Sequence, residues 1–182
     1  VAGLVVALAI SAGASYLLSR MKDTIRRTVW ALTIQVQKGR FTPSDFEVSF
    51  SQADHLEAIR FQLTEEEKMR LRGRIDRVDA MEDPDQNKVY VKVIDYKTGN
   101  TSFDLVYLYH GLQLQLMIYL DGALQVEQKK YAGREVVPAG VFYYNIKDPM
   151  IQEKIDADLE TVSSGIMKEL KMNGLVQSDP DI

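Results

Sequence analysis

Two aspartates and a lysine have the residue types and spacing that metal-assisted hydrolysis requires. Asp95 and Lys97 lie in the segment VIDYKTG at residues 93–99, and side chains two apart on a strand point to the same face. Asp76 lies on the other side of the turn DPDQN. A regular hairpin around that turn would place the Cβ atoms of Asp76 and Asp95 about 5 Å apart. The alternative is a plain ion pair between Asp95 and Lys97.

A divalent cation suits two converging carboxylates. Without one, the two negative charges repel and one aspartate must keep its proton near neutral pH. Mg²⁺ or Mn²⁺ would be bound by the carboxylate oxygens and leave positions for water and a phosphate. Lys97 can then orient an attacking water or offset charge that develops on phosphorus. Arg72 and Arg74 share the face of Asp76 and can hold a phosphodiester backbone; alternatively, they pair with neighbouring carboxylates.

The elements that would position these residues form a mixed α/β pattern. Residues 16–38 repeat apolar side chains at helical spacing and end at Gly39. Alternation predicts an antiparallel meander of four strands, at 46–50, 56–63, 69–81 and 88–97. A helix over 104–131 with Asp104 as its N-cap, a strand over 136–146 and a helix over 151–174 follow. We therefore expect a central mixed sheet with an antiparallel hairpin, flanked by helices.

Composition narrows the function. The chain has 182 residues, a net charge of −4 and no cysteine. It therefore has no disulfide, thiolate metal site or cysteine nucleophile, which suits a reducing cytoplasm. It contains no P-loop motif for ATP hydrolysis. Residues 1–19 carry no charge and are long enough to cross a bilayer, but they have no basic region at their N-terminal end. We expect a buried or partner-facing helix there, with a membrane or signal segment as the alternative.

Three segments also resemble a known family. GRIDRVD, VIDYKTG and HGLQLQLMIYL, in that order, resemble the successive motifs of RecB-like nucleases of the PD-(D/E)XK group. The resemblance implies a restriction-endonuclease-like core, with Asp76 and Asp95 binding Mg²⁺ or Mn²⁺ and Lys97 as the catalytic lysine. It gives Gln115 and Tyr119 the role of supporting the site or touching DNA, and their spacing places them on one helical face.

A narrower resemblance adds YLLSRMKDTIRRTVWAL and PAGVFYYNIKDP. Together the segments are similar to the C-terminal nuclease domain of AddB-type subunits of bacterial helicase–nucleases that repair double-strand breaks by recombination. This implies a cytoplasmic, exonuclease-type hydrolase that acts on DNA beside an AddA-like partner subunit, with no membrane association. Residues 1–182 would form one nuclease domain of a larger subunit, with 1–40 as a helical lead-in and 41–182 as the core. The alternative is a catalytically silent module that binds DNA or a subunit.

The family pattern also bears on a glutamate, the histidines and the cysteines, and the chain departs from it in the last two. Relatives often add an upstream glutamate to the metal site, which implies Glu47 in FEVSF, although alternation equally places Glu47 in solvent. A histidine often completes the metal ligands, but His55 and His110 do not lie where the family has one. Because cysteine is absent, the iron–sulfur cluster of AddB-type proteins can belong to a parent protein but not to this chain.

Overall fold

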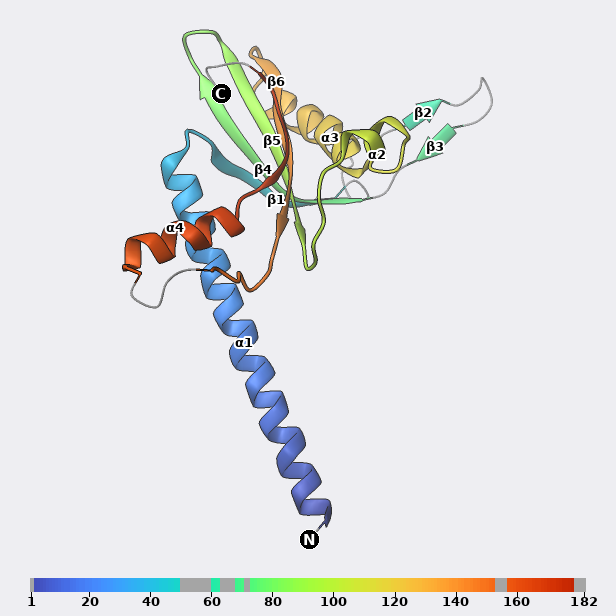
Figure 1. The fold of residues 1–182 in the computed structure, drawn as a ribbon. Helices are drawn as coiled ribbons and strands as arrows, with labels where there is room; N and C mark the ends of the chain where they lie inside the picture. The colour runs from blue at the N-terminus through green and yellow to red at the C-terminus, as the bar shows by residue number, and fades with distance from the viewer. Residues whose placement is uncertain (1, 50–59, 63–67, 71–72, 153–156, 179–182) are drawn as a thin grey trace. The chain divides into compact units, whose positions relative to one another are not determined.

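A computed structural model describes residues 2–49, 60–62, 68–70, 73–152 and 157–178 (Figure 1). The chain divides into two compact units. One comprises Val1–Lys38 with Ile146–Lys171, and the other comprises Gly39–Asn145 with Met172–Ile182. The second unit contains the main sheet and the candidate site residues that the structure describes.

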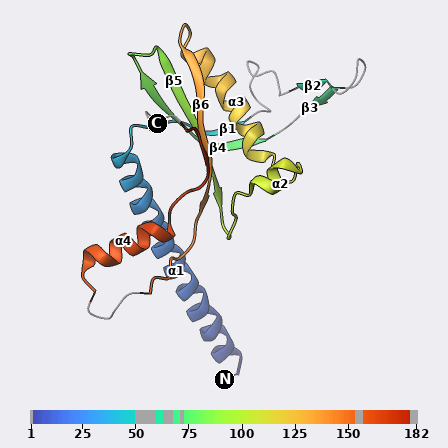
Figure 2. The same ribbon diagram turned by 45° about the horizontal axis from the view of Figure 1, so that its top comes forward.

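The main sheet has five strands in the order β1-β4-β5-β6-β7 (Figures 1 and 2). Its strands are β1 (Thr42–Ser49), β4 (Arg74–Asp83), β5 (Lys88–Lys97), β6 (Glu135–Asn145) and β7 (Asn173–Val176). Only the β5–β6 pairing is parallel; the other three pairings are antiparallel. The predicted mixed sheet with a central hairpin is thus confirmed. The expected four-strand meander is wrong, because β1 pairs directly with β4, whereas β2 (Arg60–Gln62) and β3 (Lys68–Arg70) pair with each other.

The β4–β5 hairpin is regular, as its sequence predicts. Its register runs from Asp83 opposite Lys88 to Arg77 opposite Ile94. The Asp83 carboxylate begins the turn by accepting hydrogen bonds from two backbone N–H groups that follow it, a common role for aspartate in turns. One further step of the same register brings Asp76 opposite Asp95. The hairpin therefore determines how close the two carboxylates lie.

The predicted helix over 104–131 is interrupted. It forms α2 (Leu105–Tyr109) and α3 (Gln115–Lys130), with the predicted N-cap Asp104 in place. The break lies at Gly111, whose φ of 75° is a left-handed conformation that glycine adopts readily and that ends helices.

α3 completes the crossover between the parallel strands β5 and β6. It packs on one face of the sheet, and together they form the larger hydrophobic cluster of the unit (Figure 2). Its fully buried members include Val78, Val91, Val93, Leu116, Ala123 and Val141. Burial of such side chains removes apolar surface from water, so this cluster fixes α3, and with it Gln115, against the strands that carry Asp76 and Asp95.

The chain after β6 differs from the predicted helix over 151–174. The helix α4 spans only Leu159–Glu169, and the Asp158 side chain accepts a hydrogen bond from the Thr161 backbone N–H as its N-cap. β7 follows and pairs with β6. Gly174 allows this pairing, because a Cβ at this position would lie 1.9 Å from the Val141 carbonyl oxygen. The helical pattern of the sequence does not reveal this close approach.

In the other unit, α1 (Ala2–Lys38) ends directly before Gly39, as predicted. Gln35 Nε2 donates a hydrogen bond to the Leu170 carbonyl oxygen at 3.1 Å, which ties α1 to the end of α4. Arg20 and Arg27 both contact the Asp148 carboxylate. Within the described part of the chain, no helix is long and apolar enough to span a membrane.

Candidate active site

The β4–β5 hairpin brings Asp76, Asp95 and Lys97 into one cluster. Lys97 Nζ lies 2.6 Å from Asp95 Oδ2. Asp76 Oδ2 accepts a 2.8 Å hydrogen bond from the Tyr96 backbone N–H, between the other two residues. Asp95 is almost fully buried, Asp76 is partly exposed and Lys97 is partly exposed. The proximity expected from the turn is therefore present.

The first turn of α3 holds this cluster through Gln115. Its Nε2 donates to Asp95 Oδ1 at 3.1 Å and to the Tyr119 hydroxyl at 3.0 Å. Its Oε1 accepts a hydrogen bond from Lys97 Nζ at 3.2 Å. One amide thus contacts both members of the ion pair. The break before α3 makes this possible, because Gln115 is the first residue of the new helix.

Burial and charge act on the cluster in opposite directions. Burial raises the pKa of Asp95; Lys97 opposes that rise and the charge of Asp76 adds to it. Burial alone would lower the pKa of Lys97, but the hydrogen bond and charge of Asp95 raise it above its ordinary value. Lys97 is therefore a protonated ammonium at neutral pH. As a cation it can orient groups and stabilise negative charge.

Tyr143 is a neighbour of the cluster that the sequence analysis missed. It lies opposite Asp95 in the parallel β5–β6 register, and Lys97 Nζ is 5.5 Å from the centroid of its ring. Burial raises the pKa of its hydroxyl. The sequence contains no local signal for this contact, because the parallel register is set across the whole α2–α3 crossover.

The structure does not bring Glu47 into a cluster of metal-binding residues. The neighbouring β1–β4 pairs, Phe46–Arg77 and Val48–Ile75, place Glu47 across from Asp76 along the strands. Its φ of 52° interrupts the regular backbone, and its exposed carboxylate lies 3.7 Å from Arg74 Nη1. The described residues contain no group of three or more His, Asp or Glu side chains able to hold a metal.

The remaining residues that the sequence singles out are two arginines and two histidines. Arg74 is exposed at the start of β4, where its guanidinium pairs with Glu47. Arg72 lies outside the described residues, as does His55. Exposed His110 ends α2 and its ring meets that of Tyr109 edge to face.

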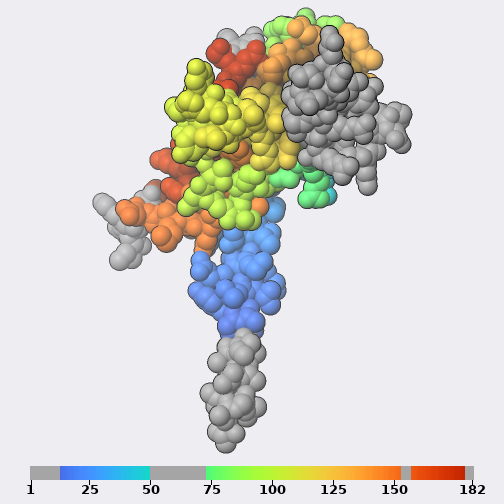
Figure 3. All heavy atoms as spheres, turned by 90° about the vertical axis from the view of Figure 1, so that its right-hand side faces the viewer, coloured from blue at the N-terminus to red at the C-terminus, as the bar shows by residue number. Residues whose placement is uncertain are grey.

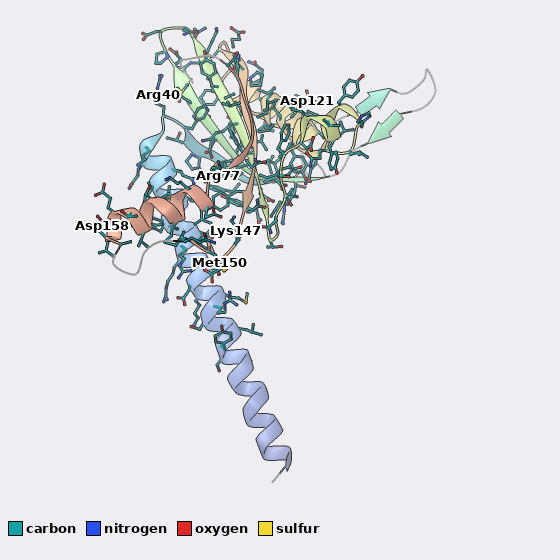
Figure 4. All side chains as sticks on the ribbon, viewed as in Figure 1. Arg40, Arg77, Asp121, Lys147, Met150 and Asp158 are labelled. Atoms are coloured by element: carbon teal, nitrogen blue, oxygen red, sulfur yellow. The ribbon has the colours of Figure 1, made fainter. Side chains whose placement is uncertain are left out.

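A second charged cluster lies on the opposite face of the same hairpin. Arg77, labelled in Figure 4, donates through Nε and Nη2 to both oxygens of Asp79, at 2.5 and 2.8 Å. Lys92 Nζ lies 3.3 Å from the same carboxylate, and Arg77 Nη1 donates to the Tyr96 hydroxyl at 3.4 Å. Burial lowers the pKa of Lys92. We call Arg77, Asp79 and Lys92 the buried ion cluster; strand alternation separates it from Asp76 and Asp95.

The donor set of Asp76 and Asp95 fits Mg²⁺ better than a cation that needs a complete cage of protein ligands. Mg²⁺ is usually held by one or two carboxylates, with waters and substrate phosphates in its other positions. The two aspartates provide those carboxylates, and the single ammonium of Lys97 leaves one negative charge uncompensated among the three. The two aspartates therefore provide donors of the kind that Mg²⁺ uses in proteins.

Comparison with known proteins agrees with the geometry. The family model described as "PD-(D/E)XK nuclease superfamily" matches residues 3–178. Relatives from Lachnoclostridium phytofermentans, Alkaliphilus metalliredigens and Alkaliphilus oremlandii, each named as a subunit of an ATP-dependent helicase/deoxyribonuclease, are 45%, 44% and 43% identical to this chain. The matches cover 90%, 92% and 92% of this chain but only 13%, 14% and 14% of the relatives. The chain thus spans a small part of their length.

Proposed function

Because the chain belongs to the PD-(D/E)XK nuclease superfamily, we propose that it is a metal-dependent deoxyribonuclease module that hydrolyses phosphodiester bonds in DNA. The observation that carries this proposal is the set of contacts by which Gln115 holds Asp95 and Lys97 beside Asp76. Asp76 and Asp95 would hold Mg²⁺ or Mn²⁺, with Glu47 as a third candidate ligand. When bound, the cation would polarise the phosphate and lower the pKa of a water molecule.

The chain's own residues supply the rest of the chemistry. Lys97, kept protonated by Asp95, offsets negative charge on the phosphate oxygens as the nucleophile adds. Gln115 fixes the positions of Lys97 and Asp95, and Tyr119 in turn fixes the Gln115 amide. Exposed Arg74 can contact a phosphate next to the one that is cleaved, and we extend that role to Arg72.

We further propose the setting implied by the relatives' names. The chain would be part of a larger helicase–nuclease subunit that acts in the repair of DNA double-strand breaks in the cytoplasm. An AddA-like subunit would be its partner, and any iron–sulfur cluster would be held by other parts of the parent protein, since this chain has no cysteine. Digestion from a DNA end, as an exonuclease, is the activity that suits such a complex.

The decisive experiment measures cleavage of linear single-stranded DNA in Mg²⁺, in Mn²⁺ and in EDTA. Asp95→Asn removes the buried carboxylate while keeping its shape, and Asp121→Asn is the matched control. Asp121 is an exposed residue of α3 whose carboxylate accepts a hydrogen bond from Gln125, one helical turn away (Figure 4). We expect cleavage with either metal, none in EDTA, none with Asp95→Asn and normal cleavage with Asp121→Asn.

The alternative is a silent module of the same fold, and it is favoured by one observation. Both oxygens of Asp95 already have contacts within the chain. Measurement of Mg²⁺ binding by calorimetry separates the possibilities. Binding that depends on Asp95 without cleavage would mean that another part of the parent completes the site; absence of both would contradict the nuclease proposal for this chain. A loss of Mg²⁺ affinity in Glu47→Gln would identify Glu47 as the third ligand.

A further inference from the structure

α2 and the turn after it expose a run of apolar and aromatic side chains next to the proposed active site. Nine large hydrophobic side chains are exposed in the described part of the sheet unit, and six of them lie within residues 105–114. These six are Leu105, Val106, Tyr107, Tyr109, Leu112 and Leu114, and Tyr109 is 87% exposed. Figure 3 shows the yellow-green atoms of this segment protruding from the surface. Such a concentration usually marks an interaction site.

The backbone of this segment is held at both ends. At its start, the Asp104 carboxylate accepts hydrogen bonds from two backbone N–H groups of α2. At its end, the backbone N–H of Leu112 donates to the Tyr107 carbonyl oxygen, and that of Gly111 donates to the Leu108 carbonyl oxygen. With the positive φ of Gly111, these two bonds form a Schellman motif. The exposed side chains thus stand on an ordered backbone.

Side-chain hydrogen bonds tie the same segment to the rest of the unit. Gln113 accepts a hydrogen bond from the Asp104 backbone N–H and donates one to the Ser102 carbonyl oxygen. The Phe103 backbone N–H donates to the side chain of Asn173 at the start of β7, and the Phe103 ring packs against the main core cluster. A backbone fixed in this way needs little further ordering when a ligand binds, which lowers the entropy lost on binding.

The segment connects the two elements that form the active site. It begins shortly after Lys97 at the end of β5 and ends directly before Gln115 at the start of α3. Three residues of extended chain span at most about 11 Å, so the backbone of Leu112 lies within that distance of Gln115. By the same limit, Tyr109 lies within about 21 Å of it. A strand with one phosphate at Lys97 can therefore pass over this segment.

We propose that Tyr107, Tyr109 and Leu112 form a stacking platform for unpaired bases of the DNA strand that enters the active site. This inference rests on the proposed nuclease function. Residues 105–114 contain no Lys, Arg, Asp or Glu, so the segment cannot hold phosphates by charge and offers mainly rings and apolar side chains. Bases of single strands stack on such side chains irrespective of sequence, whereas bases in a duplex already stack on each other. The platform therefore selects single-stranded DNA.

The test measures equilibrium binding of a fluorescein-labelled oligothymidylate by anisotropy in EDTA, where no cleavage occurs. The double variant Tyr107→Ala/Tyr109→Ala removes both rings. The control is Tyr16→Ala, which removes from α1 a ring whose exposure, 63%, lies between those of Tyr107 and Tyr109. We expect the double variant to bind about tenfold or more weakly and the control to bind as the unaltered chain does. An abasic oligomer of equal length should bind the unaltered chain and the double variant equally.

Three results would overturn the platform. The first is that the unaltered chain and the double variant bind oligothymidylate equally, and the second is that the unaltered chain binds the abasic and the base-containing oligomers equally. The third is that the double variant loses binding to a partner subunit while its DNA binding is unchanged. Tyr109→Phe keeps the ring and should bind normally, which checks that stacking is being measured. Because the assay contains no metal, a chain that cleaves DNA but binds it independently of Tyr107 and Tyr109 refutes the platform alone. Tyrosine-dependent binding without any cleavage in Mg²⁺ refutes the nuclease function instead.

Discussion

The two faces of the β4–β5 hairpin each carry a buried aspartate with a lysine on the same strand pair, yet their charge balance differs. On one face, Asp79 is fully buried and is contacted by two cations, Arg77 and Lys92. On the other face, Asp95 is contacted by one cation, Lys97, and is influenced by a second carboxylate, Asp76. The first face thus carries surplus positive charge within its cluster, and the second carries surplus negative charge.

This difference separates a structural ion cluster from the metal site that we propose. Asp79 has both oxygens satisfied by a bidentate guanidinium, a geometry that is strong and specific. A further cation would gain little there. At Asp95 and Asp76, an added divalent cation would relieve repulsion between the carboxylates. A buried carboxylate is therefore a candidate for metal binding only where the protein leaves its charge uncompensated.

The largest effect should come from Lys97, and Lys92 on the same strand provides the comparison. We expect Lys97→Met to reduce the rate of DNA cleavage by about a hundredfold or more, because no other ammonium faces Asp95 among the described residues. Lys92→Met should leave that rate within about twofold, since Lys92 faces Asp79 on the other side of the sheet. Initial rates at saturating Mg²⁺ provide the measurement. Equal losses in both variants would mean that cleavage reflects the stability of the hairpin and not the chemistry of one face.

For the free energy of unfolding we expect the reverse order of the two faces: substitution of Asp79 should matter more than substitution of Asp95. Asp79→Asn leaves buried Arg77 and partly buried Lys92 without their carboxylate. Breaking a buried pair in this way costs about 3–5 kcal/mol of unfolding free energy. Asp95→Asn should change it by less than about 1 kcal/mol at pH 7, because burial of its charge and attraction to Lys97 oppose each other. Urea unfolding followed by circular dichroism compares the two variants.

The stability of the Asp95→Asn variant should depend on pH in a defined direction. The pKa of Asp95 is raised in the folded state. The contribution of its carboxyl group to the free energy of unfolding is therefore most favourable below the ordinary pKa of an aspartate. The contribution is lost as pH rises through the raised value. Asp95→Asn should therefore reduce the loss of stability between mildly acidic and neutral pH. Greater destabilisation by Asp95→Asn than by Asp79→Asn at pH 7 would contradict our assignment of roles.

Local sequence patterns predicted the site residues on the β4–β5 hairpin. They missed the features that depend on contacts between residues far apart in the sequence. The turn at residues 83–87 fixes the register, so the proximity of Asp76 and Asp95 followed from counting residues. Tyr143 and the break between α2 and α3 depend on the parallel β5–β6 pairing and on a glycine conformation. The buried ion cluster was not predicted, because no local pattern shows that Arg77 and Asp79, which alternate with the predicted site residues, are buried.

An effect smaller than that of Asp79→Asn is expected at Tyr144 on β6, whose hydroxyl is buried without a hydrogen-bond partner in the described part of the chain. Tyr144→Phe removes this unsatisfied group and should stabilise the fold by about 1 kcal/mol, seen as a melting temperature about 2–4 °C higher. Tyr16→Phe, at an exposed position of α1, is the control and should change nothing.

Alkaline pH provides an independent check on Tyr144, because burial raises the pKa of its hydroxyl to about 12. The unfolded chain ionises this group near pH 10, while the folded chain keeps it neutral. The contribution of this hydroxyl to the free energy of unfolding is therefore constant below pH 10 and falls as pH rises toward 12. The advantage of Tyr144→Phe over the unaltered chain should widen across this range. A constant advantage would show that the hydroxyl finds a partner or water in solution, and that this face of the sheet is less dry than its ion cluster implies.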